Sequence, residues 1–325
     1  MKIVFCGTPS FAVPTLEALL GADHEIALVV SQPDRPAGRG RQLTAPPVKL
    51  AAMAAGLSVI QPEKIRGNPE FRAQLESIVP DAIVVVAYGR IIPPWMLALP
   101  RLGCINLHAS LLPKYRGAAP VQWAVAMGDA FTGNTTMLLE EGLDTGPILL
   151  QQTLPIGPDQ TAVDLFDLLA HAGAPLVVET LAGLADGIIH AQPQNHSFAS
   201  FAPLLDREDG RMDFAARTAR ELCNRWRGFQ PWPGAFTTLD GKKLIVHRMA
   251  VAVAPGYSQS GPAESGPALP GQIRIENHRL FVACAGETWL EFLELQLEGK
   301  KRLPAAEFLR GAALPAGARL GFPTP

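Results

Sequence analysis

Apolar residues along the first half of the chain gather in short runs that predict the strands of a sheet. These runs are residues 3–5, 26–31, 82–87, 104–107, 135–139 and 148–152. Between the first four runs, apolar side chains recur at helical spacing instead of alternating. Strands that alternate with helices in this way are typical of a doubly wound, mostly parallel α/β sheet. A longer helical pattern follows, from Thr161 to about Ala185.

The pattern changes beyond that helix. Residues 190–208 are polar and irregular, as expected of a linker, and from Ala235 onward short alternating runs predict strands. Asp240-Gly241 between two such runs is a strong signal for a two-residue hairpin. Residues 254–270 are rich in Pro, Gly and Ser and predict a loop. We therefore expect an α/β domain at 1–189, a linker at 190–208 and a small β-barrel domain at 209–325.

The composition indicates a globular chain, and the length indicates about two domains. Its 325 residues are 48% hydrophobic and 18% charged, which is enough for packed cores. The cysteines lie far apart without a C-x-x-C pair, so neither a metal site nor a disulfide framework is supported. The N-terminal apolar run is too short for a signal peptide, and no run approaches the roughly 20 residues of a membrane helix. We therefore expect a cytoplasmic protein without a membrane segment.

Charge is divided unevenly between the two halves of the chain. Residues 1–189 carry 12 Lys and Arg against 17 Asp and Glu, whereas residues 209–325 carry 15 against 11. The whole chain has a formal net charge of −2. A basic C-terminal half fits a domain that handles RNA, and it fits an uneven surface charge without function equally well.

Residues 103–147 hold the candidate chemistry. Asn106 and His108 stand two residues apart in a predicted strand, so their side chains project from the same face. The strand ends soon afterwards because the segment Leu111-Leu112-Pro113 cannot continue it. His108 is therefore predicted at the carboxyl end of a strand, where open α/β sheets bind ligands. Asp144, in a turn between two later strands, can reach the same edge.

An amide, an imidazole and a carboxylate suit the transfer of an acyl group onto a neutral amine. The imidazole and the amide can donate hydrogen bonds to the tetrahedral oxyanion, while the carboxylate orients the imidazole. No nucleophilic serine or cysteine is needed. Taken singly, each residue is also explained without catalysis, because histidines at strand ends are commonly surface residues and Asn and Asp are common turn formers.

The same residues carry a resemblance to a known family. The pattern of Asn106, His108, the Ser-Leu-Leu-Pro run at 110–113 and Asp144 in a G-x-D-T-G turn resembles the formyltransferases that use 10-formyltetrahydrofolate. Four further segments resemble the branch of that family that acts on the methionine carried by initiator tRNA. They are residues 5–20, 31–49, 84–93 and 295–311. Arg90 and Trp123 depart from the family's pattern, which leaves local contacts near the folate open.

The resemblance implies roles for residues of the first domain. Asn106, His108 and Asp144 would be the catalytic residues, with no metal ion involved. The 10-formyltetrahydrofolate would lie at the strand ends, beside the Asp144 turn. The residues expected to contact it are Val86, Tyr88, Gly89, Ile91, Ser110, Leu111, Leu112, Pro113, Gly142 and Leu143. The C-terminal domain of the family is an OB-like barrel, in agreement with the strand pattern found here.

Two basic elements are candidates for tRNA contacts. The resemblance implies that the loop at 32–49, with Arg39 and Arg41 beside glycines, enters the acceptor stem of the initiator tRNA. A helix predicted at 215–227 places Arg217, Arg220, Asn224 and Arg227 on one side, where they can track phosphates. In a protein that binds no RNA, the first would be a surface loop and the second a solvated helix face. The expected tRNA contacts are Arg39, Arg41, Arg217, Arg220, Lys300, Lys301 and Arg302.

The resemblance therefore implies formyl transfer from 10-formyltetrahydrofolate to the α-amino group of methionine on initiator tRNA. The expected partners are the folate donor and initiator methionyl-tRNA, with no membrane and no obligate protein partner. One alternative is formyl transfer to a sugar nucleotide, to glycinamide ribonucleotide or to another small amine, although a small acceptor needs neither the basic loop nor the barrel. Others are a formyltetrahydrofolate hydrolase, which releases tetrahydrofolate without an acceptor, and a tRNA-binding module without catalysis.

Overall fold

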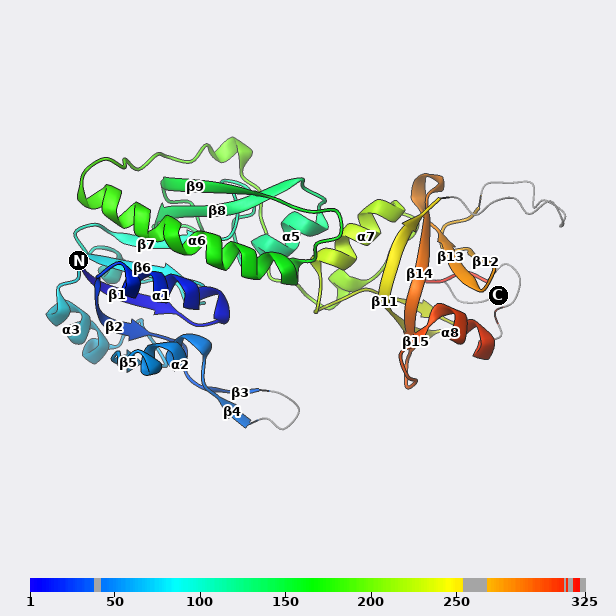
Figure 1. Cartoon of the computed structure of the whole chain (residues 1–325), viewed down its shortest axis with the longest axis horizontal. Coiled ribbons are helices and arrows are strands. Elements are labelled where there is room, and N and C mark those ends of the chain that lie inside the picture. The colour runs from blue at the N-terminus through cyan, green and yellow to red at the C-terminus, as the bar shows by residue number, and fades with distance from the viewer. Residues whose placement is uncertain (38–41, 254–267, 313, 315–317, 322–325) are drawn as a thin grey trace. The chain divides into compact units, whose positions relative to one another are not determined.

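The computed structural model describes residues 1–37, 42–253, 268–312, 314 and 318–321, and it divides into two compact units (Figure 1). The first unit comprises Met1–Val121, Ala130–Gly157 and Asp164–Leu204. The second comprises Gln122–Asp129, Pro158–Val163 and Leu205–Pro325. The first unit thus extends to Leu204, past residue 189, where the sequence placed the end of the first domain.

The first unit is built on a seven-stranded sheet with the order β5-β2-β1-β6-β7-β8-β9. The strands are β1 (Lys2–Gly7), β2 (Glu25–Val30), β5 (Val59–Ile60), β6 (Ala82–Val86), β7 (Cys104–His108), β8 (Phe131–Leu138) and β9 (Ile148–Pro155). The first five strands in the order run parallel, while β8 and β9 are antiparallel additions at one edge. This confirms the predicted doubly wound, mostly parallel sheet and its six predicted strands.

Helices cover both faces of this sheet. On one face, Val4, Ile83 and Cys104 join a core that includes residues of α3 (Pro69–Ile78) and α4 (Pro94–Leu97). On the other face, α1 (Val13–Gly21) and α6 (Ala162–Ala185) lie across the sheet, with α2 (Pro47–Ala54) next to α1 (Figure 1). Phe11 beside α1 meets Phe166 of α6 edge to face, at a ring separation of 6.1 Å. Burial on both faces explains why these strands read as continuous apolar runs.

The long helix α6 corrects one sequence prediction. It has 24 residues and is apolar enough by length and composition to cross a membrane, so the expectation that no run approaches that length was wrong. Its composition follows from packing within the first unit. Gly173 lies so close to β7 that a Cβ there would come within 2.7 Å of the Leu107 side chain. Thr180 shares a 2.8 Å hydrogen bond with Thr136 of β8.

The second unit holds a curled antiparallel sheet with the order β10-β11-β14-β13-β12, and β15 pairs with β14. The strands are β10 (Phe236–Leu239), β11 (Lys242–Ala252), β12 (Ile273–Glu276), β13 (Arg279–Ala283), β14 (Trp289–Leu297) and β15 (Leu303–Pro304). The register between β11 and β14 shifts on both sides of Arg248, and such irregularities bend a strand pair. The sheet closes over a core that includes Leu244, Phe292 and, from α8 (Ala305–Gly311), Phe308. This half-barrel confirms the predicted OB-like fold.

Turn predictions in the second unit have different outcomes. Asp240 and Gly241 connect β10 to β11 with φ values of 49° and 74°, which confirms the two-residue hairpin. Of the loop predicted at 254–270, residues 254–267 lie outside the described part of the chain.

Candidate active site

His108 is the last residue of β7 and is 6% exposed. Its side chain and that of Asn106 lie on one face of the strand, because Leu107 between them points toward α6. The Nε2 atom of His108 lies 2.9 Å from the Tyr115 carbonyl oxygen, so in the ring form with a proton on Nε2 it donates a hydrogen bond there. Its Nδ1 atom lies 3.8 Å from Oδ2 of Asp144. The strand end and the Asp144 turn therefore meet at this imidazole.

Asp144 reaches His108 by a reversal of the chain. Strand β8 is antiparallel to β7, and its last residue, Leu138, pairs with Ile105 near the start of β7. The connection to β9 must therefore turn back along β7 to bring Asp144 beside His108. Gly146 makes the reversal possible, because a Cβ at this position would lie only 1.9 Å from the Leu138 carbonyl oxygen.

The Asp144 carboxylate is held by main chain as well as by the imidazole. Its Oδ2 atom accepts a 2.8 Å hydrogen bond from the amide of Gly117. The loop that follows β7 thus supports both side chains, the imidazole through the Tyr115 carbonyl and the carboxylate through the Gly117 amide. Backbone groups in a packed loop are fixed donors and acceptors, so the relative placement of imidazole and carboxylate is determined before any substrate binds.

Two polar residues that the sequence did not single out shape the Ser-Leu-Leu-Pro loop. The Thr135 hydroxyl donates to the Ser110 carbonyl (2.6 Å) and accepts from the Leu112 amide (3.1 Å). The Gln151 amide donates to the Leu112 carbonyl at 2.9 Å. Their positions follow from the register of β8 and β9 against β7, which the sequence pattern does not encode.

The residues predicted to contact folate divide into two sets in the structure. Val86, Tyr88, Ser110 and Leu112 are buried, and the Ser110 hydroxyl donates to the Lys114 carbonyl. Burial raises the pKa of the Tyr88 phenol well above its ordinary value. Gly142, Leu143 and Ile91 are exposed, with Ile91 at 72% and Leu143 at 63%, while Leu111 and Pro113 are half-buried. Gly89, at φ 79°, follows the end of β6.

Arg90, one of the two departures from the family pattern, ties the end of β6 to neighbouring loops. Its Nε atom donates to Gln32 Oε1 and its Nη1 to the Glu63 carbonyl. Gln32 in turn donates to the Tyr88 carbonyl at 3.1 Å. The other departure, Trp123, packs edge to face against Phe229 within the second unit.

The loop at residues 32–49, called the arginine loop from here on, is described except for residues 38–41. Arg39 and Arg41 lie outside the described residues, between β3 (Arg35–Ala37) and β4 (Gln42–Thr44). These two strands pair antiparallel, so the loop leaves the first unit on a two-stranded stem (Figure 1). At the base of the stem, the Lys49 ammonium donates a 2.8 Å hydrogen bond to the Asp34 carboxylate and lowers the pKa of that carboxyl group.

The basic helix of the second unit differs from its prediction. α7 (Ala219–Gly228) begins at Ala219 and not at residue 215, because Thr218 and Glu221 form a capping box that starts the helix there. Arg227, predicted on the solvated face, is 6% exposed and donates to the Gln160 carbonyl and to Asn224, which is also buried. The prediction that Asn224 and Arg227 share an exposed side of the helix with Arg217 and Arg220 is therefore wrong.

The remaining candidates for tRNA contact lie apart on the surface of the second unit. Arg217 precedes α7 and is half-buried, whereas Arg220 is exposed. Lys300, Lys301 and Arg302 follow β14 and are exposed, and Arg302 is paired with Glu294.

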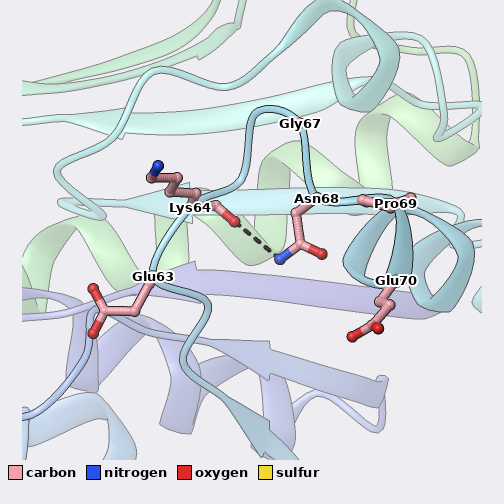
Figure 2. Close-up of a pocket in the computed structure, with 6 residues that line it drawn as sticks. All are labelled: Glu63, Lys64, Gly67, Asn68, Pro69 and Glu70. Atoms are coloured by element: carbon pink, nitrogen blue, oxygen red, sulfur yellow. Dashed lines mark hydrogen bonds between the residues drawn. The ribbon is translucent and has the colours of Figure 1, made fainter.

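A hollow in the first unit lies outside this constellation. Figure 2 shows it beside the start of α3, lined by Glu63, Lys64, Gly67, Asn68, Pro69 and Glu70. Asn68 donates to the Lys64 carbonyl and caps the helix by accepting from the Phe71 amide, so its polar groups serve the local fold. Within the described residues, no three His, Cys, Asp or Glu side chains gather where they could hold a metal ion.

Comparison with known proteins agrees with this geometry. Residues 1–181 match the Formyl transferase family, and residues 204–313 match Formyl transferase, C-terminal domain. A protein of Acidobacterium capsulatum named Methionyl-tRNA formyltransferase is 64% identical over 321 residues, which cover 99% of this chain and 100% of the relative.

Two solved structures share the fold at low sequence identity. WlaRD, a sugar 3N-formyl transferase solved in the presence of dTDP and 5-N-formyl-THF, has a TM-score of 0.62 at 16% identity, covering 93% of this chain and 99% of WlaRD. HypX from Aquifex aeolicus, solved with tetrahydrofolic acid, has a TM-score of 0.58 at 16% identity. This chain is covered over 95% of its length but spans only 47% of HypX.

Proposed function

This chain belongs to the formyl transferase family, and from that membership we propose that it formylates the α-amino group of the methionine carried by initiator tRNA. The product is N-formylmethionyl-tRNA, which starts translation. The observation that carries the proposal is that the sequence similarity extends over both units. It covers the α/β unit, which holds the candidate site, and the half-barrel. We place the reaction in the cytoplasm, with the charged tRNA and a folate as its two substrates.

The donor that we propose is 10-formyltetrahydrofolate, bound beside the end of β6 and the Asp144 turn. Ile91 and Leu143 support this position, because each exposes most of an apolar side chain that a pteridine or benzoyl ring could cover. The buried side chains of Val86, Tyr88 and Leu112 would shape the site from beneath, without direct contact. Gly89 and Gly142 would let the donor approach the main chain closely.

The reaction needs no covalent enzyme intermediate. The methionyl nitrogen forms a bond to the formyl carbon, the carbon's bond to the folate N10 breaks, and the proton lost by the amine is gained by the departing folate nitrogen through water. The carbonyl oxygen carries negative charge in between. Asn106 and His108 would stabilise that oxyanion by hydrogen bonding, a contribution of about 10²- to 10³-fold in rate for one donor in comparable sites.

His108 has one ring nitrogen available for this chemistry. Nε2 faces the Tyr115 carbonyl and Nδ1 faces Asp144, so we assign the contact with the substrate to Nδ1. The Asp144 carboxylate lies 3.8 Å from Nδ1 and would orient the ring, so that a proton on Nδ1 is donated as a hydrogen bond to the oxyanion. Asp144 would thus act on the imidazole, and its own position depends on the Gly117 amide.

Transfer to a small amine is less well supported than transfer to tRNA. The relatives that match the full chain at high identity carry the tRNA name, whereas the sugar formyl transferase shares only the fold. The two acceptors also demand different proteins, since a nucleotide-sized amine does not need a second unit with exposed cations such as Arg220, Lys300 and Lys301.

One assay separates these functions. The purified protein is incubated with 10-formyltetrahydrofolate and, in parallel, with charged initiator tRNA, charged elongator tRNA, free methionine, an amino-sugar nucleotide or no acceptor. We expect formylation of charged initiator tRNA above all other acceptors, and tetrahydrofolate release only when an acceptor is present. Equal release without acceptor would establish a hydrolase, and preference for the amino sugar would overturn the tRNA proposal.

A further inference from the structure

Asp144 holds a backbone conformation that needs support from its surroundings. Its φ of 50° lies in the left-handed region, which aspartate adopts more readily than most residues but still at a cost. Such conformations persist where neighbouring groups over-determine them. Asp144 lies in the connection between β8 and β9, outside the residues that pair with β7. The hydrogen bonds between strands therefore do not hold Asp144 against His108.

Gln194 clamps this turn. Its side chain is 5% exposed, and its Nε2 atom donates to the carbonyl oxygens of Asp144, at 2.9 Å, and Gly146, at 2.7 Å. One amide group thereby fixes the main chain on both sides of Thr145. Gln194 Oε1 also accepts hydrogen bonds from Arg116, so the position needs a side chain that both donates and accepts, as an amide does.

Arg116 fixes the orientation of Gln194. The Nε and Nη2 atoms of Arg116 donate to Gln194 Oε1 at 3.1 and 2.6 Å, and Nη2 also lies 3.2 Å from Nδ1 of His196. The arginine is only 4% exposed, and the side-chain partners of its guanidinium among the described residues are the Gln194 amide and the His196 imidazole. Burying a cation is costly, and here the buried cation donates to a glutamine oxygen. These bonds keep the glutamine amide in one orientation, with its nitrogen toward the Asp144 turn.

The segment that carries Gln194 also supports the other side of the imidazole. Residues 192–202, which we call the strap, run from an antiparallel bridge between Gln192 and Ile148 to a parallel bridge between Phe201 and Arg116. Within the strap, Ser200 accepts the Tyr115 amide on its hydroxyl oxygen at 2.9 Å. The Tyr115 carbonyl is the group that faces Nε2 of His108. The strap therefore backs both His108 contacts, and it lies between the two segments matched to the family.

We propose that Gln194, oriented by Arg116, is a positioning residue that sets Asp144 against His108, so that the strap completes the active site. The inference rests on the proposed function where it is tested by the rate of formylation. Its test by hydrogen exchange does not depend on that function. Gln194 touches neither substrate nor the reacting atoms in this assignment. Its loss should therefore lower turnover more than it weakens the binding of either substrate.

The test compares three full-length variants. Gln194→Ala removes the clamp. Gln194→Glu keeps the length and an acceptor for Arg116 but presents a carboxylate to the two carbonyl oxygens, so it tests the donation without emptying the site. Gln192→Ala is the matched control, since Gln192 is an exposed glutamine of the same strap whose bridge to Ile148 uses only main-chain atoms.

We expect kcat to fall about 10- to 100-fold in both Gln194 variants, because a misplacement near 1 Å costs on the order of 100-fold. KM for the tRNA should change less than about threefold. KM for the folate should rise by less than kcat falls, because Leu143 of the same turn is a proposed folate contact. The control should match the parent protein. Hydrogen exchange of the peptide that spans residues 140–147 should be faster in both Gln194 variants without substrate present.

The two readouts separate the possible failures. Faster exchange of the turn in a protein that formylates no tRNA would overturn the proposed function and leave the positioning role intact. The positioning role would be overturned if Gln194→Glu had the kcat of the parent protein. It would also be overturned if residues 140–147 exchanged at the parent rate in both Gln194 variants. A rise in KM with unchanged kcat would assign Gln194 to binding and would also contradict the proposal.

Discussion

The Nδ1 atom of His108 lies 3.8 Å from Oδ2 of Asp144, which is longer than a hydrogen bond. The carboxylate is meanwhile bonded to the Gly117 amide. Under the proposed function, Asp144 orients the imidazole and the Nδ1 side of the ring contacts the substrate. Several measurable consequences depend on that arrangement.

The first prediction concerns the three candidate catalytic residues. Asn106→Ala, His108→Ala and Asp144→Ala should each lower kcat by about 10²- to 10³-fold or more, because each removes a donor to the oxyanion or the group that orients one. Thermal melts should show that the variants stay folded. Steady-state formylation of charged initiator tRNA is the measurement, and near-normal turnover of His108→Ala would contradict the mechanism.

The second prediction concerns the arginine loop. Arg39→Ala and Arg41→Ala should lower the rate of tRNA formylation while changing stability by less than about 0.5 kcal/mol. We expect the larger loss for Arg39, because both its neighbours are glycines and its side chain can penetrate furthest. The control is Arg66→Ala, at an exposed arginine of the first unit. Unchanged rates for both loop variants at low and moderate salt would argue against an RNA role.

The third prediction concerns the exposed cations of the second unit. Lys300→Gln with Lys301→Gln, and separately Arg220→Gln, should weaken the use of tRNA and flatten its dependence on salt, since each lost phosphate contact reduces the logarithmic slope by about 0.7 to 0.9. Arg302 is a poorer probe because it already pairs with Glu294. Lys64→Gln, an exposed lysine of the first unit, serves as the control. A salt slope equal to that of the parent would remove these residues from the interface.

The fourth prediction concerns stability. Gly133 lies in β8 where a Cβ would come within 2.0 Å of the Gln152 carbonyl oxygen of β9, so Gly133→Ala should lower the free energy of unfolding by about 1–3 kcal/mol. Gly21 ends α1, and a Cβ there meets no atom within 4 Å. Gly21→Ala should accordingly be neutral or stabilise by up to about 1 kcal/mol. Denaturant unfolding of both variants compares the two sites, and equal effects would show that the strand contact is not rigid.

The fifth prediction concerns acid. The Lys2 amide and then Arg101 lower the pKa of the Asp81 carboxyl group, so the ionised form stabilises the folded state. That contribution is present above the ordinary carboxyl value of about 4 and is lost as pH falls from there through the lowered pKa. Asp81→Asn should therefore destabilise the protein at neutral pH, and its deficit should shrink below about pH 4. Asp186→Asn, at an exposed aspartate, is the control, and a deficit that does not vary with pH would refute the linkage.

The sequence pattern predicted the sheet well because its strands are buried on both faces and therefore read as clear apolar runs. It also predicted that Asn106 and His108 share a face, since that follows from strand alternation alone. The start of α7 was missed because the capping box of Thr218 and Glu221 overrides an amphipathic pattern that extends further back. The burial of Arg227 was missed because its partners, Asn224 and Gln160, are recognisable only in three dimensions.

The surroundings of the candidate site were beyond the reach of pattern analysis for a different reason. Thr135 and Gln151 act through strand register, and Gln194 acts across a gap of 50 residues to Asp144 and 78 to Arg116. None of these residues stands in a motif, and glutamine in an irregular polar segment is ordinarily unremarked. Side-chain bonds between distant segments leave no periodic trace in a sequence.

The late position of the strap has a consequence for how the enzyme is made. A ribosome synthesises the chain from its N-terminus, and domains generally fold in that order. A nascent chain that has reached the end of α6 contains Asn106, His108 and Asp144, yet it lacks the amide that clamps the Asp144 turn. Under the proposed role of Gln194, full catalytic activity would arise only after residues 192–202 have been synthesised, just before the chain enters the half-barrel.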